Sequence, residues 1–130
     1  MPAGGCLCGA VRYEFAGEPY GGAICHCRTC QSIHAAPMVG FFSVKLADFR
    51  VTGDLSDYRS SNHAVRRFCP ACGTHLLFDD SNYPDEIDVA AATLDDPDAF
   101  TPRFHIWAHS QAAWVKLGDG LRAFPERSHA

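Results

Sequence analysis

The sequence predicts a mainly β domain of short strands with little helix, and two features of the chain support this fold class. Short stretches of strand composition recur along its length, separated by glycine and proline residues typical of turns. No long amphipathic helical pattern lies between them. A chain of 130 residues is the usual length of one domain, so we expect a single domain over residues 1–130.

The first half of the chain contains three expected strands and one helical turn. Residues 11–15 alternate apolar and charged side chains, which indicates a half-buried strand. Residues 22–24 are expected to form a short strand that leads into the segment CHCRTC, and one helical turn is expected within residues 29–35. Residues 37–44 are an apolar run of strand length.

Two hairpins are expected in the middle of the chain. Residues 49–52 and 55–59 have strand composition and flank a Gly-Asp pair that begins at Gly53, a combination favoured in hairpin turns. Residues 65–68 enter a C-x-x-C turn and residues 75–78 leave it, which predicts the second hairpin.

The last third of the chain continues the β pattern. Residues 86–94 alternate again, and residues 104–107 have strand composition. Residues 95–100 between them are polar and are expected to form a turn or a single helical turn.

Charge and hydropathy argue against two classes of partner. The net charge is −4, and Arg66-Arg67 is the one adjacent basic pair, so a nucleic-acid partner is not expected. No apolar run approaches the roughly 20 residues that span a bilayer, so no membrane partner is expected. The first residues lack the basic and apolar regions of a signal peptide, and we therefore expect a cytoplasmic protein.

Seven cysteines dominate the possible chemistry. An odd number argues against a pure disulfide framework, and in a reducing compartment clustered cysteines indicate metal binding or catalysis. By spacing they form three groups: Cys6 and Cys8; Cys25, Cys27 and Cys30; Cys69 and Cys72.

The two pairs predict a closed metal site. Zinc prefers four tetrahedral ligands, and a C-x-x-C turn such as Cys69–Cys72 supplies two of them. Cys6 and Cys8 are the natural complement, and together the four would form a structural zinc site.

The remaining group, Cys25, Cys27 and Cys30, leaves one zinc ligand unassigned. Three protein ligands with an open position indicate a zinc that takes part in chemistry. In the reverse arrangement, CHCRTC would take a fourth cysteine from another group and leave two other thiols outside any site. The spacing therefore favours the division of the cysteines into groups of four and three.

The ordered motifs resemble those of a known family. The segments GGCLCGAVRYEF, CHCRTCQ, YRSSNHAVRRFCPACGTHL, DEIDVAAATLDDPDAF and PRFHIWAHSQAAW, from Gly4 to about Phe124, are similar to the glutathione-dependent formaldehyde-activating enzyme family. The resemblance implies a β-tent fold, in which two layers of short strands converge on zinc. It implies two zinc ions per chain, a structural one on Cys6, Cys8, Cys69 and Cys72 and a second on Cys25, Cys27 and Cys30.

This resemblance implies a zinc-dependent carbon–sulfur lyase or synthase acting on a thiol–aldehyde adduct, such as S-(hydroxymethyl)glutathione. The expected partner is a small thiol such as glutathione, and Cys25, Cys27 and Cys30 would be the catalytic residues as ligands of the open zinc. An exchangeable position also means that this second zinc is held less securely.

Two other interpretations of the cysteines stay open. A non-catalytic zinc module that binds a protein or a small thiol would close the second site with a fourth protein ligand. A thiol redox protein would use Cys25, Cys27 and Cys30 to form a reversible disulfide and would lose metal on mild oxidation.

Four other side chains near these motifs are of interest. His26 lies between two expected ligands and is a candidate fourth ligand of the second zinc. Because adjacent side chains of an extended loop point to opposite sides, a role next to the metal ligands or on the surface is favoured over ligation. His75 follows the C-x-x-C turn and is expected to be a packing or hydrogen-bonding residue. His105 and Trp107 share one face of an expected strand, in a segment that belongs to the family pattern, and are candidate substrate-binding residues.

Overall fold

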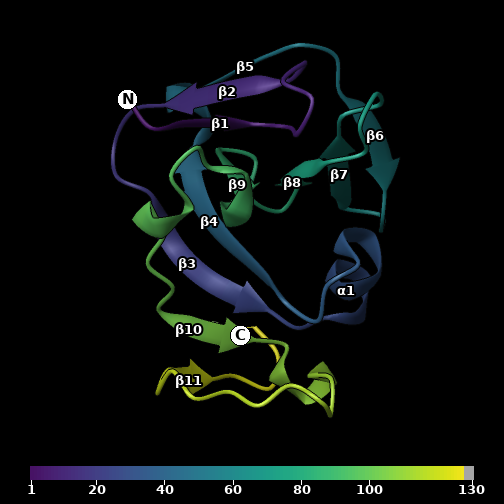
Figure 1. The fold of residues 1–130 in the computed structure, drawn as a ribbon, viewed down its shortest axis with the longest axis vertical. Helices are drawn as coiled ribbons and strands as arrows, with labels where there is room; N and C mark the ends of the chain where they lie inside the picture. Colours follow the sequence, from purple (N-terminus) through teal and green to yellow (C-terminus); the bar gives the residue numbers. More distant parts are fainter. Residues whose placement is uncertain (128–130) are drawn as a thin grey trace.

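The computed structural model describes residues 1–127, which form two sheets of short strands with a single α-helix (Figure 1). The mainly β fold class is therefore confirmed. Neighbouring strands are antiparallel, except that β10 runs parallel to both β3 and β11. The smaller sheet has the order β1 (Ala3–Gly5), β2 (Arg12–Phe15), β5 (Phe49–Thr52). The larger sheet has the order β11 (Arg122–Ala123), β10 (Phe104–Ile106), β3 (Tyr20–Cys25), β4 (Val39–Lys45), β9 (Glu86–Ala90), β8 (His75–Asp80), β7 (Ala64–Phe68), β6 (Ser56–Arg59).

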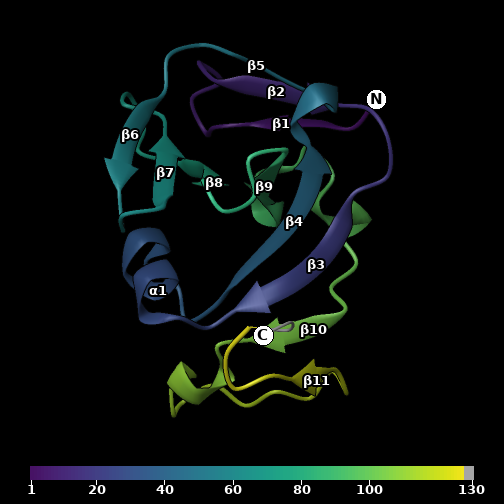
Figure 2. The same cartoon turned by 180° about the vertical axis from the view of Figure 1, so that it is seen from behind.

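The smaller sheet covers one end of the molecule, and β10 and β11 lie at the opposite end (Figures 1 and 2). The long strands β3 and β4 run between these two ends. The helix α1 (Arg28–His34) follows β3 directly and lies beside the end of the sheet that carries β6 and β7. Four 3-10 turns complete the described elements: η1 (Leu46–Asp48), η2 (Ala91–Thr93), η3 (Pro97–Ala99) and η4 (Ala108–Ser110).

The main core lies between the two sheets. Phe15 of β2 packs on Phe42 of β4 across this interface, with ring centroids 5.4 Å apart. The alternation of each strand explains this packing, because every second side chain of β2 and β4 faces the opposite sheet. Ile87 and Val89 of β9 enter the same core and are fully buried.

The expected hairpin around Gly53 is wrong. β5 pairs with β2 in the smaller sheet, whereas β6 pairs with β7 in the larger one, so the chain crosses between sheets at this point. Gly53 has a positive φ of 95°, and a Cβ there would meet the Ala10 carbonyl oxygen at 2.1 Å. The glycine thus serves a close backbone crossing rather than a two-residue hairpin turn.

Helix α1 is short and is capped by a cysteine. The Cys27 thiol accepts a hydrogen bond from the backbone N–H of Cys30 at 3.3 Å, and the helix ends at Ala35, which has a left-handed φ of 49°. Within residues 1–127 no helix has both the length and the hydropathy needed to cross a membrane.

Candidate metal centres

The first group of cysteines brings together both sheets. Cys6 and Cys8 follow β1, whereas Cys69 and Cys72 lie on the turn between β7 and β8. Their four sulfur atoms lie within 4.8 Å of one another, with Cys6–Cys8 and Cys8–Cys69 separations of 3.6 and 3.8 Å. Zn–S bonds of about 2.3 Å give a tetrahedron with sulfur–sulfur edges of about 3.8 Å. The spacing of the four sulfurs therefore fits a tetrahedral metal ion with metal–sulfur bonds of about 2.3 Å.

Backbone and hydroxyl groups hold these sulfurs in place. The Val11 N–H donates to Cys6 Sγ at 3.2 Å, and the Cys72 sulfur lies 3.3 Å from the Thr74 hydroxyl. The Thr74 hydroxyl and backbone lower the pKa of Cys72 to about 5. Gly73 leaves the C-x-x-C turn with a positive φ of 80°, which lets the chain return into β8. At Cys72 the Thr74 contacts therefore favour the thiolate that a metal ligand requires.

The second group lies within six residues of sequence. Cys25 is the last residue of β3, Cys27 caps α1, and Cys30 lies in its first turn. Their sulfurs also lie within 4.8 Å of one another, and no histidine, aspartate or glutamate of residues 1–127 joins them. Cys25 and Cys30 are buried while Cys27 is partly exposed.

The three neighbouring thiols oppose one another electrostatically. Hydrogen bonding from Cys25 lowers the pKa of Cys27 to about 2, whereas hydrogen bonding with Cys27 raises the pKa of Cys25. Three thiols at this spacing ionise together only when a cation offsets their charge. A divalent metal ion provides that charge, so the donor set fits a metal at this position.

A buried arginine contacts this cluster. Arg66 of β7 is 6% exposed, and its Nη1 lies 3.4 Å from Cys30 Sγ. Its Nε donates to the Ser60 hydroxyl at 3.3 Å, and its guanidinium carbon lies 4.4 Å from the centroid of the Phe78 ring. Nothing in the sequence pattern singled out Arg66, because its partners lie on other elements.

His26 is turned away from the three sulfurs. It is fully buried, and its Nε2 lies 2.8 Å from Nδ1 of His105, which is also fully buried. The second ring nitrogen of His105, Nε2, lies 2.8 Å from a carboxylate oxygen of Asp119. Burial lowers the pKa of His26. No sequence pattern indicates a role for Asp119, which lies in a loop before β11.

Of the two candidate substrate-binding residues, His105 belongs to this chain of hydrogen bonds, and Trp107 follows it by two positions. Since His105 is fully buried with both ring nitrogens engaged, it would influence a ligand through His26. Trp107 is partly buried, has a left-handed φ of 56° and packs near His109, with ring centroids 5.7 Å apart. A substrate contact of either residue stays a prediction. His75 stacks on Phe68 with centroids 4.7 Å apart.

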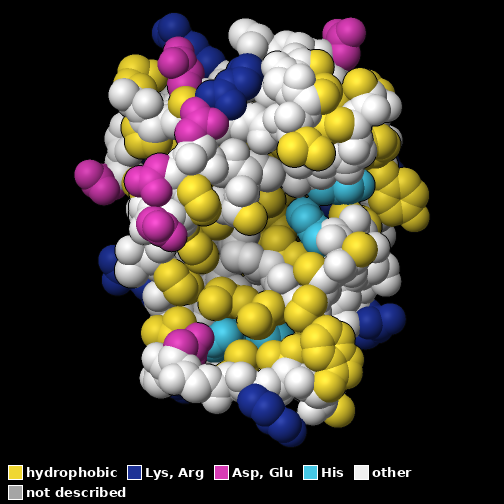
Figure 3. Space-filling view, in the orientation of Figure 1, with side chains coloured by type: hydrophobic (Ala, Val, Ile, Leu, Met, Phe, Trp, Pro, Cys, Tyr) yellow, Lys and Arg dark blue, Asp and Glu magenta, His cyan; other side chains and the backbone are white. Residues whose placement is uncertain are grey.

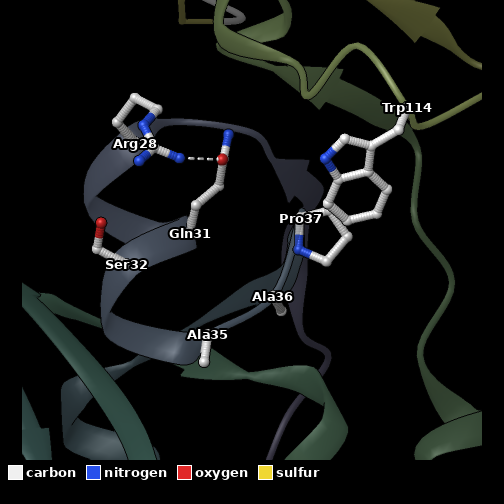
Figure 4. A pocket seen from close by; sticks show the side chains of 7 residues that line it. All are labelled: Arg28, Gln31, Ser32, Ala35, Ala36, Pro37 and Trp114. Atoms are coloured by element: carbon white, nitrogen blue, oxygen red, sulfur yellow. Dashed lines mark hydrogen bonds between the residues drawn. The ribbon is translucent and has the colours of Figure 1, made fainter.

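Two surface features lie near α1. Figure 3 shows histidine and hydrophobic side chains lining a hollow across the middle of one face. A separate cavity of about 300 Å³ lies against the outer face of α1, where Trp114 and Pro37 face Arg28 and Gln31 (Figure 4). Cys30 points to the opposite side of the helix from the lining residues, which recur at helical spacing. The lining residues are Arg28, Gln31, Ser32, Ala35, Ala36, Pro37 and Trp114.

Comparisons with known proteins found a matching family model and a curated relative. The family model described as glutathione-dependent formaldehyde-activating enzyme matches residues 1–110. A protein of Schizosaccharomyces pombe described as an uncharacterized lyase is 33% identical over 75 residues, covering 58% of this chain and 55% of that protein. The chain thus spans about half the length of this curated relative.

The fold also occurs in a solved structure. The crystal structure of a Rhodobacter sphaeroides protein matches with a TM-score of 0.60 and 22% identity, covering 94% of this chain and 98% of that one. At this identity the match describes the fold.

Proposed function

Because the chain belongs to the glutathione-dependent formaldehyde-activating enzyme family, we propose that it is a zinc-dependent carbon–sulfur lyase or synthase acting on a thiol–aldehyde adduct. The family description names glutathione and formaldehyde, so S-(hydroxymethyl)glutathione is the proposed adduct. The observation that carries this proposal is the group of three cysteine sulfurs that no fourth metal-binding side chain of residues 1–127 joins.

The two cysteine groups have different proposed roles. Cys6, Cys8, Cys69 and Cys72 would hold a structural zinc that joins the two sheets into one domain. Cys25, Cys27 and Cys30 would hold a second zinc with one open position. Zinc bound there would act as a Lewis acid and lower the pKa of a coordinated thiol.

The residues around the open site suit a small anionic sulfur ligand. Cys27 is the partly exposed member of the three, so its side offers a ligand the shortest way in. Arg66 adds a fixed positive charge against Cys30, and His26 and His105 fill the interior behind the loop. We further propose that the protein works in a reducing compartment such as the cytoplasm, because thiols at metal spacing would oxidise elsewhere.

A non-catalytic zinc module is the alternative function. It requires a closed second site, and among the described residues the candidate His26 is hydrogen-bonded to His105 instead. This observation favours the enzyme.

The proposal is tested by thiol binding and by formaldehyde exchange. Zinc-loaded protein is titrated with glutathione in a calorimeter, and exchange of ¹³C-formaldehyde with its glutathione adduct is followed by NMR. The wild type should bind glutathione and accelerate exchange, and Cys30→Ser should lose both. Ser32→Ala, on the outer face of α1, is the matched control and should retain both. A zinc-loaded wild type that neither binds thiols nor accelerates exchange would overturn the proposal.

A further inference from the structure

We propose that Arg66 is a positioning residue of the three-cysteine site, where its N–H donor fixes the position of the Cys30 sulfur and its fixed charge favours an anionic fourth ligand. This inference rests on the proposed function, since it assumes that the site binds a metal. Three observations support it.

The first is that Arg66 is a buried cation without a carboxylate partner. Arg66 is 6% exposed, and no ion pair among residues 1–127 includes it. Its neighbour Arg67 differs, since it pairs with Asp79 at 2.9 Å and with Asp57 at 3.4 Å. A buried charge needs a compensating charge nearby. The Cys30 sulfur lies 3.4 Å from Arg66 Nη1, and three cysteine ligands around a divalent metal, with a net charge of about −1, would supply that compensating charge.

The second is that the guanidinium is held in one orientation. Arg66 pairs with Phe78 across strands β7 and β8, which places the guanidinium over the Phe78 ring. The Ser60 hydroxyl accepts from Nε, leaving Nη1 directed at Cys30. A lysine lacks this planar fork and would bring a single ammonium to both positions.

The third is the charge balance. Three thiolates and one divalent ion sum to about −1, and Arg66 brings the local charge to about zero. An incoming thiolate then lowers the local charge to about −1, whereas without Arg66 it would lower it to about −2. An N–H donor on the Cys30 sulfur also withdraws electron density, which strengthens the bond to a fourth ligand. Arg66 would therefore favour thiolates over neutral ligands such as imidazole.

Cobalt-loaded protein allows the site to be measured without an activity assay. Arg66→Met removes the charge while keeping an unbranched apolar stem, and Arg67→Met is the matched control on the other face of the strand. Chelator competition measures cobalt affinity, the sulfur-to-cobalt absorption bands report Cys30, and titrations compare a thiol with imidazole.

Arg66→Met should weaken cobalt binding at the three-cysteine site by roughly 10- to 100-fold, shift its sulfur-to-cobalt bands and reduce the preference for the thiol. Binding at the four-cysteine site should be unchanged, and Arg67→Met should leave both sites unchanged. If Arg66→Met does not fold, Arg66→Gln tests the same loss of charge while keeping a polar donor.

Equal spectra and affinities in wild type, Arg66→Met and Arg67→Met would overturn the role of Arg66 and leave the proposed function intact, provided that the wild type still binds thiols. A wild type whose three-cysteine site takes up no metal, or is closed by a fourth protein ligand, would overturn the proposed function itself.

Discussion

The two cysteine groups differ in how far apart their members lie in the sequence. Cys6 and Cys8 follow a strand of the smaller sheet and meet Cys69 and Cys72 of the larger sheet, so this group joins both layers. The other group lies within residues 25–30, on one loop and the helix that follows. A ligand set that spans the fold stabilises it globally, whereas a local set holds a site on a scaffold that other contacts maintain.

Their surroundings differ as well. The four-cysteine group is held by neutral donors, the Val11 N–H and the Thr74 hydroxyl. The three-cysteine group meets a buried guanidinium from Arg66 and lies beside the buried pair His26 and His105. Neutral donors suit a closed shell, while a fixed charge suits a site whose own charge changes when a ligand arrives.

The largest expected effect is on the group that spans both sheets. Cys72→Ser should unfold the domain or greatly lower its melting temperature, because structural zinc contributes apparent binding energies of about 10–16 kcal/mol, comparable to the whole stability of about 5–15 kcal/mol. Circular dichroism melts with zinc analysis measure this, and Ala71→Ser in the same turn is the control. An unchanged transition with full zinc content would contradict the prediction.

The local group should respond differently. Cys30→Ser should abolish the second metal site and thiol binding while leaving a cooperative melting transition, since the core between the sheets does not depend on this loop. Metal analysis, calorimetry and thermal melts on one sample check this. Global unfolding of Cys30→Ser would remove the distinction between the two groups.

Thiol binding at the open site should depend on pH. Because a free thiol must lose its proton to bind as a thiolate, the apparent affinity should rise about tenfold per pH unit up to the thiol pKa near 8.5. Calorimetric titrations in buffers of different ionisation enthalpy should also detect release of about one proton. A flat pH profile would indicate that the thiol binds elsewhere on the protein.

On acidification, the three-cysteine site should release its metal at a higher pH than the four-cysteine site. Burial lowers the pKa of His34, at the end of α1, to about 4 from its ordinary value of 6.5. Between pH 6.5 and 4 the unfolded chain therefore binds a proton at His34 that the folded chain does not bind. The free energy of unfolding of this region falls as the pH drops through that range. His34→Gln should reduce the difference between the pH midpoints at which the two cysteine sites release their metal. A chromogenic chelator measures both midpoints.

The smallest effect is expected at Asp119, whose carboxylate contacts His105. Asp119→Ala removes the carboxylate that accepts from His105 and should lower the melting temperature less than Cys30→Ser does. Asp54→Ala, on an exposed turn, is the control. A loss of stability as large as that of Cys72→Ser would mean that the contact between Asp119 and His105 also stabilises the whole domain.

Features that depend on local spacing were predictable from the sequence. The short-spaced cysteines lie together within each set, because pairs such as Cys69–Cys72 sit on tight turns. Residues 11–15 show the alternation of apolar and charged side chains that is found in β2. Strands β1 and β11, with three and two residues, are too short to show a period.

Features that depend on long-range partners could not be predicted in this way. Gly53-Asp54 has the composition of a hairpin turn, yet β5 pairs with β2 in the smaller sheet and β6 pairs with β7 in the larger one. Arg66 reads as half of a surface basic pair until the fold brings Cys30, 36 positions earlier, against it. Asp119 acquires its role in the same way, from His105.

The most direct test of the account is zinc X-ray absorption on protein of known metal content, before and after addition of glutathione. The account predicts two zinc ions per chain with an average of about 3.5 sulfur ligands each, rising to about 4 when the thiol fills the open position. One zinc per chain, or two ions that each keep four protein ligands unchanged by the thiol, would contradict it.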